Sequence, residues 1–129
     1  MNIKTQGYFK EMPHGKSTNP SIKDFIGKED ITMIDKICTY LSAGVAIAVT
    51  PGVVHDVIDP AKGVAGTPTA LTDGTWVWPG DLAYYVKNYR LKLADEFVKT
   101  MQDNNWTINL TIEDIDFDTL MIDNNPVFD

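Results

Sequence analysis

His55, Asp56 and Asp59 are the side chains best suited to chemistry in this chain of 129 residues. An imidazole and two carboxylates in one short segment are able to bind a divalent cation or to exchange protons with a substrate. Asp59 precedes Pro60, however, and an Asp in that position commonly satisfies backbone groups of a turn. We favour the turn and keep a small metal-dependent enzyme, or a metal-binding protein, as the alternative function.

The motifs of common enzyme classes are absent from the sequence. It has no phosphate-binding glycine loop, no Cys-x-x-Cys pair, no His-Glu-x-x-His helix and no Gly-x-Ser-x-Gly elbow. His14 lies in a Pro-His-Gly turn, where we expect it to be exposed to solvent. Cys38 is the only cysteine, which excludes an intramolecular disulfide and fits a reducing compartment. We therefore predict no catalytic residue, no cofactor and no metal ligand.

Acidic residues are concentrated near the end of the chain. The net charge is −7, and residues 107–129 contain no Lys or Arg. The acids of that segment are Glu113, Asp114, Asp116, Asp118, Asp123 and Asp129. Such a field repels the phosphates of nucleic acid and steers a basic partner toward the protein, although acidic tails also serve solubility alone. We expect no binding to nucleic acid.

The dipeptide Asp73-Gly74 predicts a β-hairpin. Asp-Gly supplies the positive φ angles of a two-residue turn, and residues 67–72 and 75–78 flank it as strands. Trp76 and Trp78 are two residues apart and therefore point to the same face of their strand. We expect Trp76 in the core and Trp78 partly exposed.

Apolar residues at helical spacing predict three α-helices. We expect these helices around Ile34–Leu41, Leu82–Tyr89 and Asp95–Asn104, with a shorter helix at Ser21–Ile26. Gly44 follows the first helix, in the place of a left-handed cap.

The predicted fold class is α+β, in a single compact domain. It contains an antiparallel sheet built on the hairpin, with further strands at 45–50 and 107–112, and about three to four helices. Residues 1–18 are expected to be an irregular arm, 19–112 the core domain and 113–129 an acidic C-terminal segment. No apolar run is long enough to span a membrane, and the N-terminus lacks the apolar core of a signal peptide, so we expect a cytoplasmic protein.

The segment Leu71–Val86 has the sequence LTDGTWVWPGDLAYYV. It resembles a motif of small bacterial proteins, in which a Thr-Asp-Gly turn, an aromatic strand and Asp-Leu-Ala-Tyr-Tyr-Val precede a Tyr and a Leu-Pro-x-Glu-Phe helix. Further matching positions are Pro20–Asp24, Tyr40–Gly44, Tyr89, Leu93, Glu96 and Phe97. Ala94 stands where the motif has proline. The resemblance covers roughly residues 20–106 and leaves out the acidic C-terminus.

These bacterial proteins are similar to immunity proteins of toxin–immunity systems, including contact-dependent growth inhibition. The resemblance implies a protein that is not an enzyme and that neutralises a cognate toxin domain, such as a nuclease. A nuclease has a basic cleft, which an acidic protein is suited to cover. We expect the partner to meet Asp114, Asp116 and Asp118, with Asp56 and Asp59 as a second patch. A general protein-interaction module is a further alternative.

Overall fold

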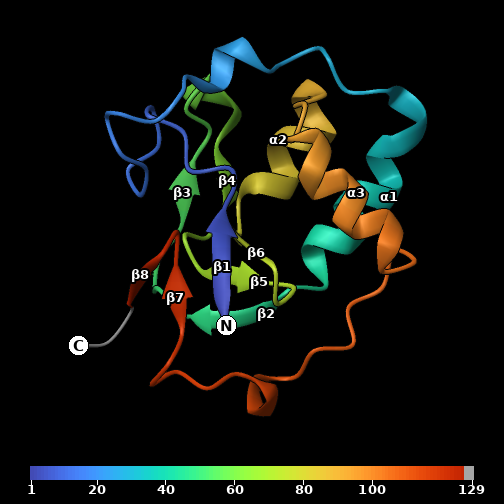
Figure 1. Ribbon diagram of the computed structural model, residues 1–129. Helices are drawn as coiled ribbons and strands as arrows, with labels where there is room; N and C mark the ends of the chain where they lie inside the picture. Colours follow the sequence, from blue (N-terminus) through green and yellow to red (C-terminus); the bar gives the residue numbers. More distant parts are fainter. Residues whose placement is uncertain (127–129) are drawn as a thin grey trace.

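The hairpin predicted at Asp73-Gly74 is present in the computed structural model, which describes residues 1–126 (Figure 1). Strand β5 (Ala70–Thr72) pairs antiparallel with β6 (Trp76–Pro79). Gly74 has a φ of +96°, in the left-handed region that favours glycine. Oδ1 of Asp73 accepts two backbone N–H groups of the turn, at 2.9 and 2.7 Å. The Asp73 side chain therefore holds the turn closed.

A strand that the sequence did not predict, β1 (Asn2–Thr5), lies inside the sheet. It runs parallel to β6 on one side and to β7 (Met121–Ile122) on the other. The sheet is therefore mixed, not antiparallel throughout, and the irregular arm predicted for residues 1–18 begins with a strand. Only Ile3 of this strand is buried, so its apolar alternation is too short to recognise in the sequence.

The strands of the main sheet follow the order β2–β5–β6–β1–β7–β8. One edge is β2 (Val45–Ala48), which confirms the strand predicted there, and the other edge is β8 (Asn125–Pro126). Strands β3 (Val54–His55) and β4 (Val64–Gly66) form a separate antiparallel hairpin. No strand forms at residues 107–112. Within residues 113–126 of the acidic C-terminal segment, strands β7 and β8 join the main sheet.

Residues 107–120 connect the last helix to β7, and we call this segment the strap. It is irregular except for one 3₁₀ turn, η4 (Ile112–Asp114). Ile115 and Leu120 of the strap join Ile3 and Val77 in a small buried cluster. Because strand side chains alternate, Val77 lies on the face of β6 opposite the two tryptophans. The strap is thus anchored to that face of the sheet by its apolar residues.

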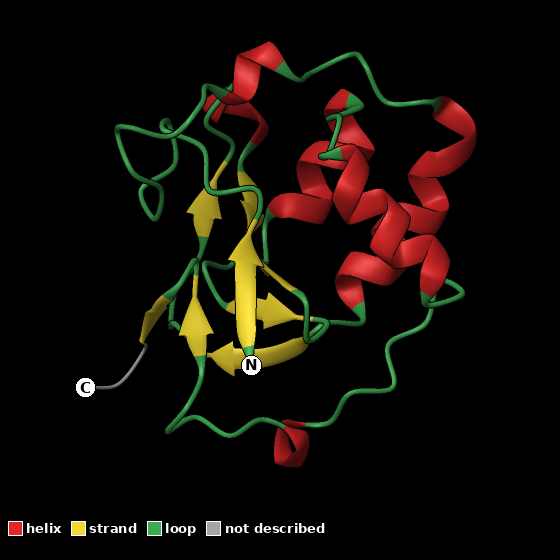
Figure 2. Ribbon diagram, in the orientation of Figure 1, coloured by secondary structure: helices red, strands yellow, loops and turns green. Residues whose placement is uncertain are grey.

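In the described part of the chain, residues 1–126, three α-helices lie beside the strands (Figure 2). They are α1 (Ile34–Ser42), α2 (Leu82–Tyr89) and α3 (Asp95–Asp103), and their bounds confirm the predicted helices. The short helix predicted at 21–26 is a 3₁₀ turn, η1 (Ile22–Asp24), and a second 3₁₀ turn, η2 (Ile31–Met33), precedes α1. No helix within residues 1–126 is long and apolar enough to cross a membrane.

The main core forms between the helices and the tryptophan face of the sheet. Trp78 is fully buried, not partly exposed, and its Nε1 donates to the Leu41 carbonyl at 3.1 Å. Its ring lies 5.3 Å from that of Phe97 on α3. A Cβ at Gly44 would come within 2.7 Å of the Trp78 ring, and the φ of Gly44 is not positive. Close packing against Trp78, rather than a left-handed cap, therefore requires the glycine.

Candidate partner-binding surface

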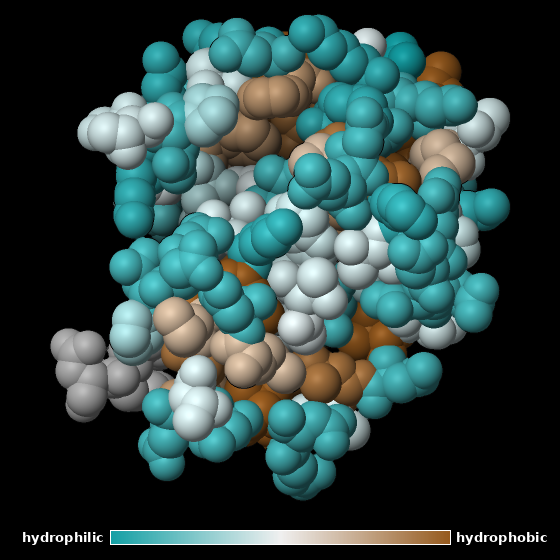
Figure 3. Space-filling view, viewed as in Figure 1, coloured by the Kyte–Doolittle hydropathy of each residue, from teal (hydrophilic) through white to brown (hydrophobic). Residues whose placement is uncertain are grey.

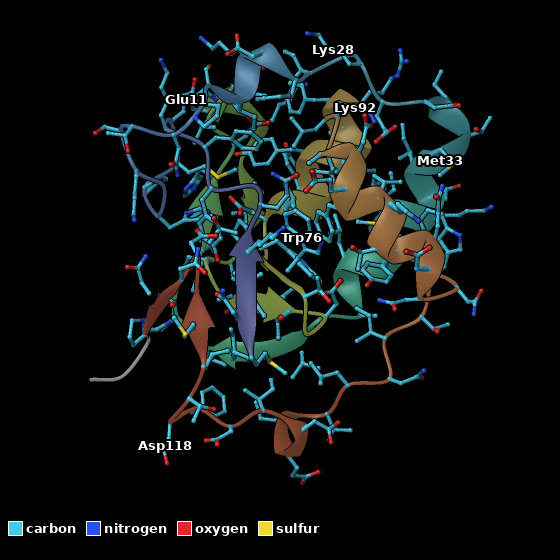
Figure 4. All side chains as sticks on the ribbon, viewed as in Figure 1. Glu11, Lys28, Met33, Trp76, Lys92 and Asp118 are labelled. Atoms are coloured by element: carbon cyan, nitrogen blue, oxygen red, sulfur yellow. The ribbon has the colours of Figure 1, made fainter. Side chains whose placement is uncertain are left out.

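The strap presents a row of carboxylates without cationic partners. Glu113, Asp114, Asp116 and Asp118 are exposed, and none forms an ion pair with any residue from 1 to 126. Asp118 points away from the body of the protein in Figure 4. Three of the carboxylates make local contacts: Glu113 Oε2 accepts the Thr111 hydroxyl at 3.5 Å, Asp114 Oδ2 accepts the Thr111 N–H at 2.8 Å, and Asp116 Oδ1 accepts the Asp118 N–H at 3.0 Å. These contacts fix the strap and leave charge for a partner.

A polar hollow of about 420 Å³ lies where α3 ends and the strap begins, and Asp73 and Asp103 are among its lining residues. The Tyr40 hydroxyl donates to Asp73 Oδ2 at 2.5 Å and accepts the Asn104 amide at 3.0 Å. Burial and the hydrogen bond to Asp73 raise the pKa of Tyr40 well above its usual value. Asp103 is exposed and pairs with Lys99 at 3.3 Å. The hollow is therefore polar, but Lys99 pairs with its Asp103 and Tyr40 is bonded to its Asp73.

Asp56 lies inside the protein, which corrects its place in the predicted second patch. Its side chain is only 1% exposed. Oδ1 accepts the N–H groups of Ile58 and Asp59 at 2.8 and 2.9 Å, and Oδ2 accepts the hydroxyls of Tyr84 and Tyr89 at 2.8 and 2.5 Å. Burial opposes its ionisation, but these hydrogen bonds outweigh burial and hold its pKa below the usual value. Asp56 therefore fastens the loop after β3 to α2.

Asp59 and His55 remain on the surface. Asp59 caps the 3₁₀ turn η3 (Pro60–Lys62), and its Oδ1 accepts the Ala61 N–H at 3.2 Å. The structure therefore supports the turn interpretation for both Asp56 and Asp59. Asp56 turns inward while His55 is exposed, and no group of three metal-ligating side chains comes together within residues 1–126. The metal-binding alternative gains no support from this geometry.

His14 and Asp81 form a buried pair that the sequence did not reveal. Nε2 of His14 lies 3.1 Å from Oδ1 of Asp81, and their side chains are 12% and 1% exposed. The prediction that His14 is exposed to solvent is therefore wrong. Nδ1 of His14 and Oδ2 of Asp81 have no hydrogen-bond partner among residues 1–126. The ring of Tyr8 meets that of His14 edge-on. The pKa of Tyr8 is raised to about 12, mainly by burial and to a smaller extent by the negative charge of Asp81. The pair links the N-terminal arm to the start of α2.

No family model, no curated protein and no solved structure matches this chain. The face in Figure 3 is mostly hydrophilic, with one hydrophobic area in its upper part and another in its lower part, above a hydrophilic rim. In Figure 1 that part contains β2, β7 and the strap. An exposed apolar area with a polar rim is typical of a surface that binds protein.

Proposed function

We propose that this protein is an immunity protein that binds a basic toxin domain, such as a nuclease domain, and covers its active-site cleft. The observation that carries this proposal is the row of exposed strap carboxylates without ion-pair partners within residues 1–126. The resemblance of Leu71–Val86 to proteins similar to bacterial immunity proteins supports the class of partner.

Because the strap is anchored to the sheet, its row of carboxylates is suited to binding a partner. Ile115 and Leu120 are buried on the sheet, so the acids between and beside them are held in place before a partner arrives. Preorganised groups lose less conformational freedom on binding than groups on a flexible tail. A field of one sign also accelerates encounter with a basic partner. Once the cleft of the toxin is covered, its nucleic-acid substrate is excluded without any chemistry by the immunity protein.

A growth-rescue assay with the gene directly upstream tests the proposal. Expression of the upstream product alone is expected to stop growth, and co-expression of this protein is expected to restore it. The purified pair is expected to form a complex whose association slows as salt rises, because salt screens the attraction. Absence of both protection and a complex would overturn the proposal.

Neutralising the strap locates the binding surface. The triple variant Asp114→Asn, Asp116→Asn and Asp118→Asn keeps the oxygens that close the strap turns but removes three charges. It is expected to slow association by about tenfold at low salt. The matched control neutralises three exposed acids elsewhere, as Asp24→Asn, Asp35→Asn and Glu96→Gln. Equal slowing in both variants would show that net charge, and not the strap, attracts the partner.

A further inference from the structure

The outer edge of β2 is open. This strand ends the sheet, and within residues 1–126 no hydrogen bond joins residues 45–49 to any element except β5. The sequence there is VAIAV, with no charge and no proline, and the Val49 side chain is 78% exposed. The opposite edge, β8, is two residues long and contains Pro126, which cannot donate to a further strand. The two edges of the sheet are therefore unequal.

The register identifies which backbone groups face outward. Bonded and non-bonded pairs alternate along antiparallel strands. The Asp73 N–H donates to the Trp76 carbonyl at 3.3 Å, so the preceding residue, Thr72, directs its N–H and C=O away from β6 and toward β2. Val45 lies opposite Thr72 and uses its groups on β5. The N–H and C=O of Ala46 therefore point to the open edge.

Acidic side chains lie beside this edge. The turn η4, which contains Glu113 and Asp114, lies against β2, and both acids are exposed. Val45 and Ile47 pack against the apolar cluster that the strap closes, and within residues 1–126 no backbone hydrogen bond joins the strap to β2. An incoming strand would thus find backbone donors and acceptors, apolar contacts at Val49 and negative charge together.

We propose that the open edge of β2 receives an extended basic segment of the protein partner, which adds a strand to the sheet while its Lys or Arg side chains reach Glu113 and Asp114. This inference rests on the proposed function and names its surface. Strand addition is a common mode of peptide recognition, in which backbone hydrogen bonds supply affinity and side chains supply specificity. Charge selects the occupant, because a second copy of this chain would bring its own acidic η4 to the same place.

The irregular register of β2 limits what the edge accepts. Pairing with β5 shifts between Ala46 and Ala48, which marks a β-bulge. A bulge increases the local twist and discourages long, flat pairing between edges. The edge is therefore suited to one short strand rather than to the stacking of many chains.

Amide exchange with a synthetic peptide tests this inference. The probe alternates Lys with Thr, and its counterpart alternates Glu with Thr. The Lys peptide is expected to slow exchange of the Ala46 amide by about tenfold, while the Glu peptide has no effect. The Val45 amide serves as an internal control, because it already bonds to β5 and is expected to change little.

Two variants at one position separate strand addition from charge attraction. Ala46→Pro removes the outward N–H, and Ala46→Val keeps it in a strand-favouring residue. Ala46→Pro is expected to weaken Lys-peptide binding by about tenfold and Ala46→Val to leave it unchanged, with the thermal melting of both variants recorded to confirm folding. No protection of Ala46, equal protection by both peptides, or a dimer that Ala46→Pro dissolves would overturn the inference.

The same variants separate this inference from the proposed function. Suppose that the upstream gene product binds, and that the strap triple variant weakens binding while Ala46→Pro does not. Strand addition at the β2 edge is then refuted, and the immunity function stands. If the upstream gene product does not bind at all, the immunity function fails whatever the peptides do.

Discussion

Asp56 and Asp81 are equally buried carboxylates with opposite surroundings. Each is 1% exposed. Asp56 accepts four hydrogen bonds, two from backbone N–H groups and two from tyrosine hydroxyls. Asp81 has one polar partner, His14, and its second oxygen has none among residues 1–126. Burial alone therefore does not describe either site.

The difference shows which member of each group the fold depends on. At Asp56 the fold depends on the carboxylate itself, because its loss leaves four hydrogen-bond donors without an acceptor. At Asp81 the partner matters more, because loss of His14 leaves a buried charge with no counter-group, and that is costlier than losing the pair as a whole. Each of the following predictions tests this contrast.

The largest effect is expected when His14 is removed. His14→Leu keeps apolar bulk but leaves the Asp81 carboxylate unpaired, which costs about 3 kcal/mol of unfolding free energy. Asp81→Asn removes the charge instead and is expected to cost about 1 kcal/mol. The double variant is expected to recover much of the loss. Urea denaturation measures all three, and a greater loss for Asp81→Asn than for His14→Leu would contradict the contrast.

A smaller effect is expected at Asp56. Asp56→Asn turns an acceptor into an amide that faces donors and is expected to cost about 2 kcal/mol. The pKa of Asp56 is lowered in the folded state, so its contribution is complete above the unfolded value of about 3.9 and is lost as pH falls through the folded pKa.

Acid denaturation checks this dependence on pH. The wild type is expected to lose stability more steeply below about pH 4 than Asp56→Asn does. Asp24→Asn, at an exposed residue with no side-chain hydrogen bond within residues 1–126, is the control and is expected to keep the slope of the wild type. An unchanged slope in Asp56→Asn would show that Asp56 is not a source of acid lability.

The smallest effect is a shift in tyrosine ionisation. The pKa of Tyr84 is raised to about 12 by its hydrogen bond to Asp56, and that of Tyr89 to about 12 by burial and then by the same carboxylate. Asp56→Asn is expected to lower both and to leave Tyr8 unchanged, whereas Asp81→Asn is expected to act on Tyr8. Ultraviolet titration of tyrosine-to-phenylalanine variants resolves the individual groups. A shift of Tyr8 in Asp56→Asn would show that the two sites are coupled.

Local pattern was enough to predict the elements that carry their own signals. The three α-helices have apolar residues at helical spacing, and the β5–β6 hairpin has its Asp-Gly turn. Strands β1 and β7 were missed, because a strand of two to four residues with few buried side chains has no detectable period. These two strands form because they pair with strands that are distant in the sequence.

The chemistry of the site was harder to predict than the fold. The exposed strap acids follow from charge composition, which a sequence displays directly. The burial of Asp56 depends on Tyr84 and Tyr89, which approach only when α2 packs against the loop after β3. His14 and Asp81 are 67 positions apart in the sequence, and no local sequence pattern predicts their contact. Long-range pairs of this kind need the tertiary structure.

The position of β1 between β6 and β7 has a consequence for synthesis on the ribosome. Residues far along the chain hold β1, with Thr5 bonded to Asp123 across 118 positions and Asn2 to Asn124 across 122. Helices form from local contacts and are able to condense while the chain is still emerging, but β1 gains its second neighbour only after β7 has been made. Until then one side of β1 is unpaired, and an unpaired strand edge is open to pairing with another molecule.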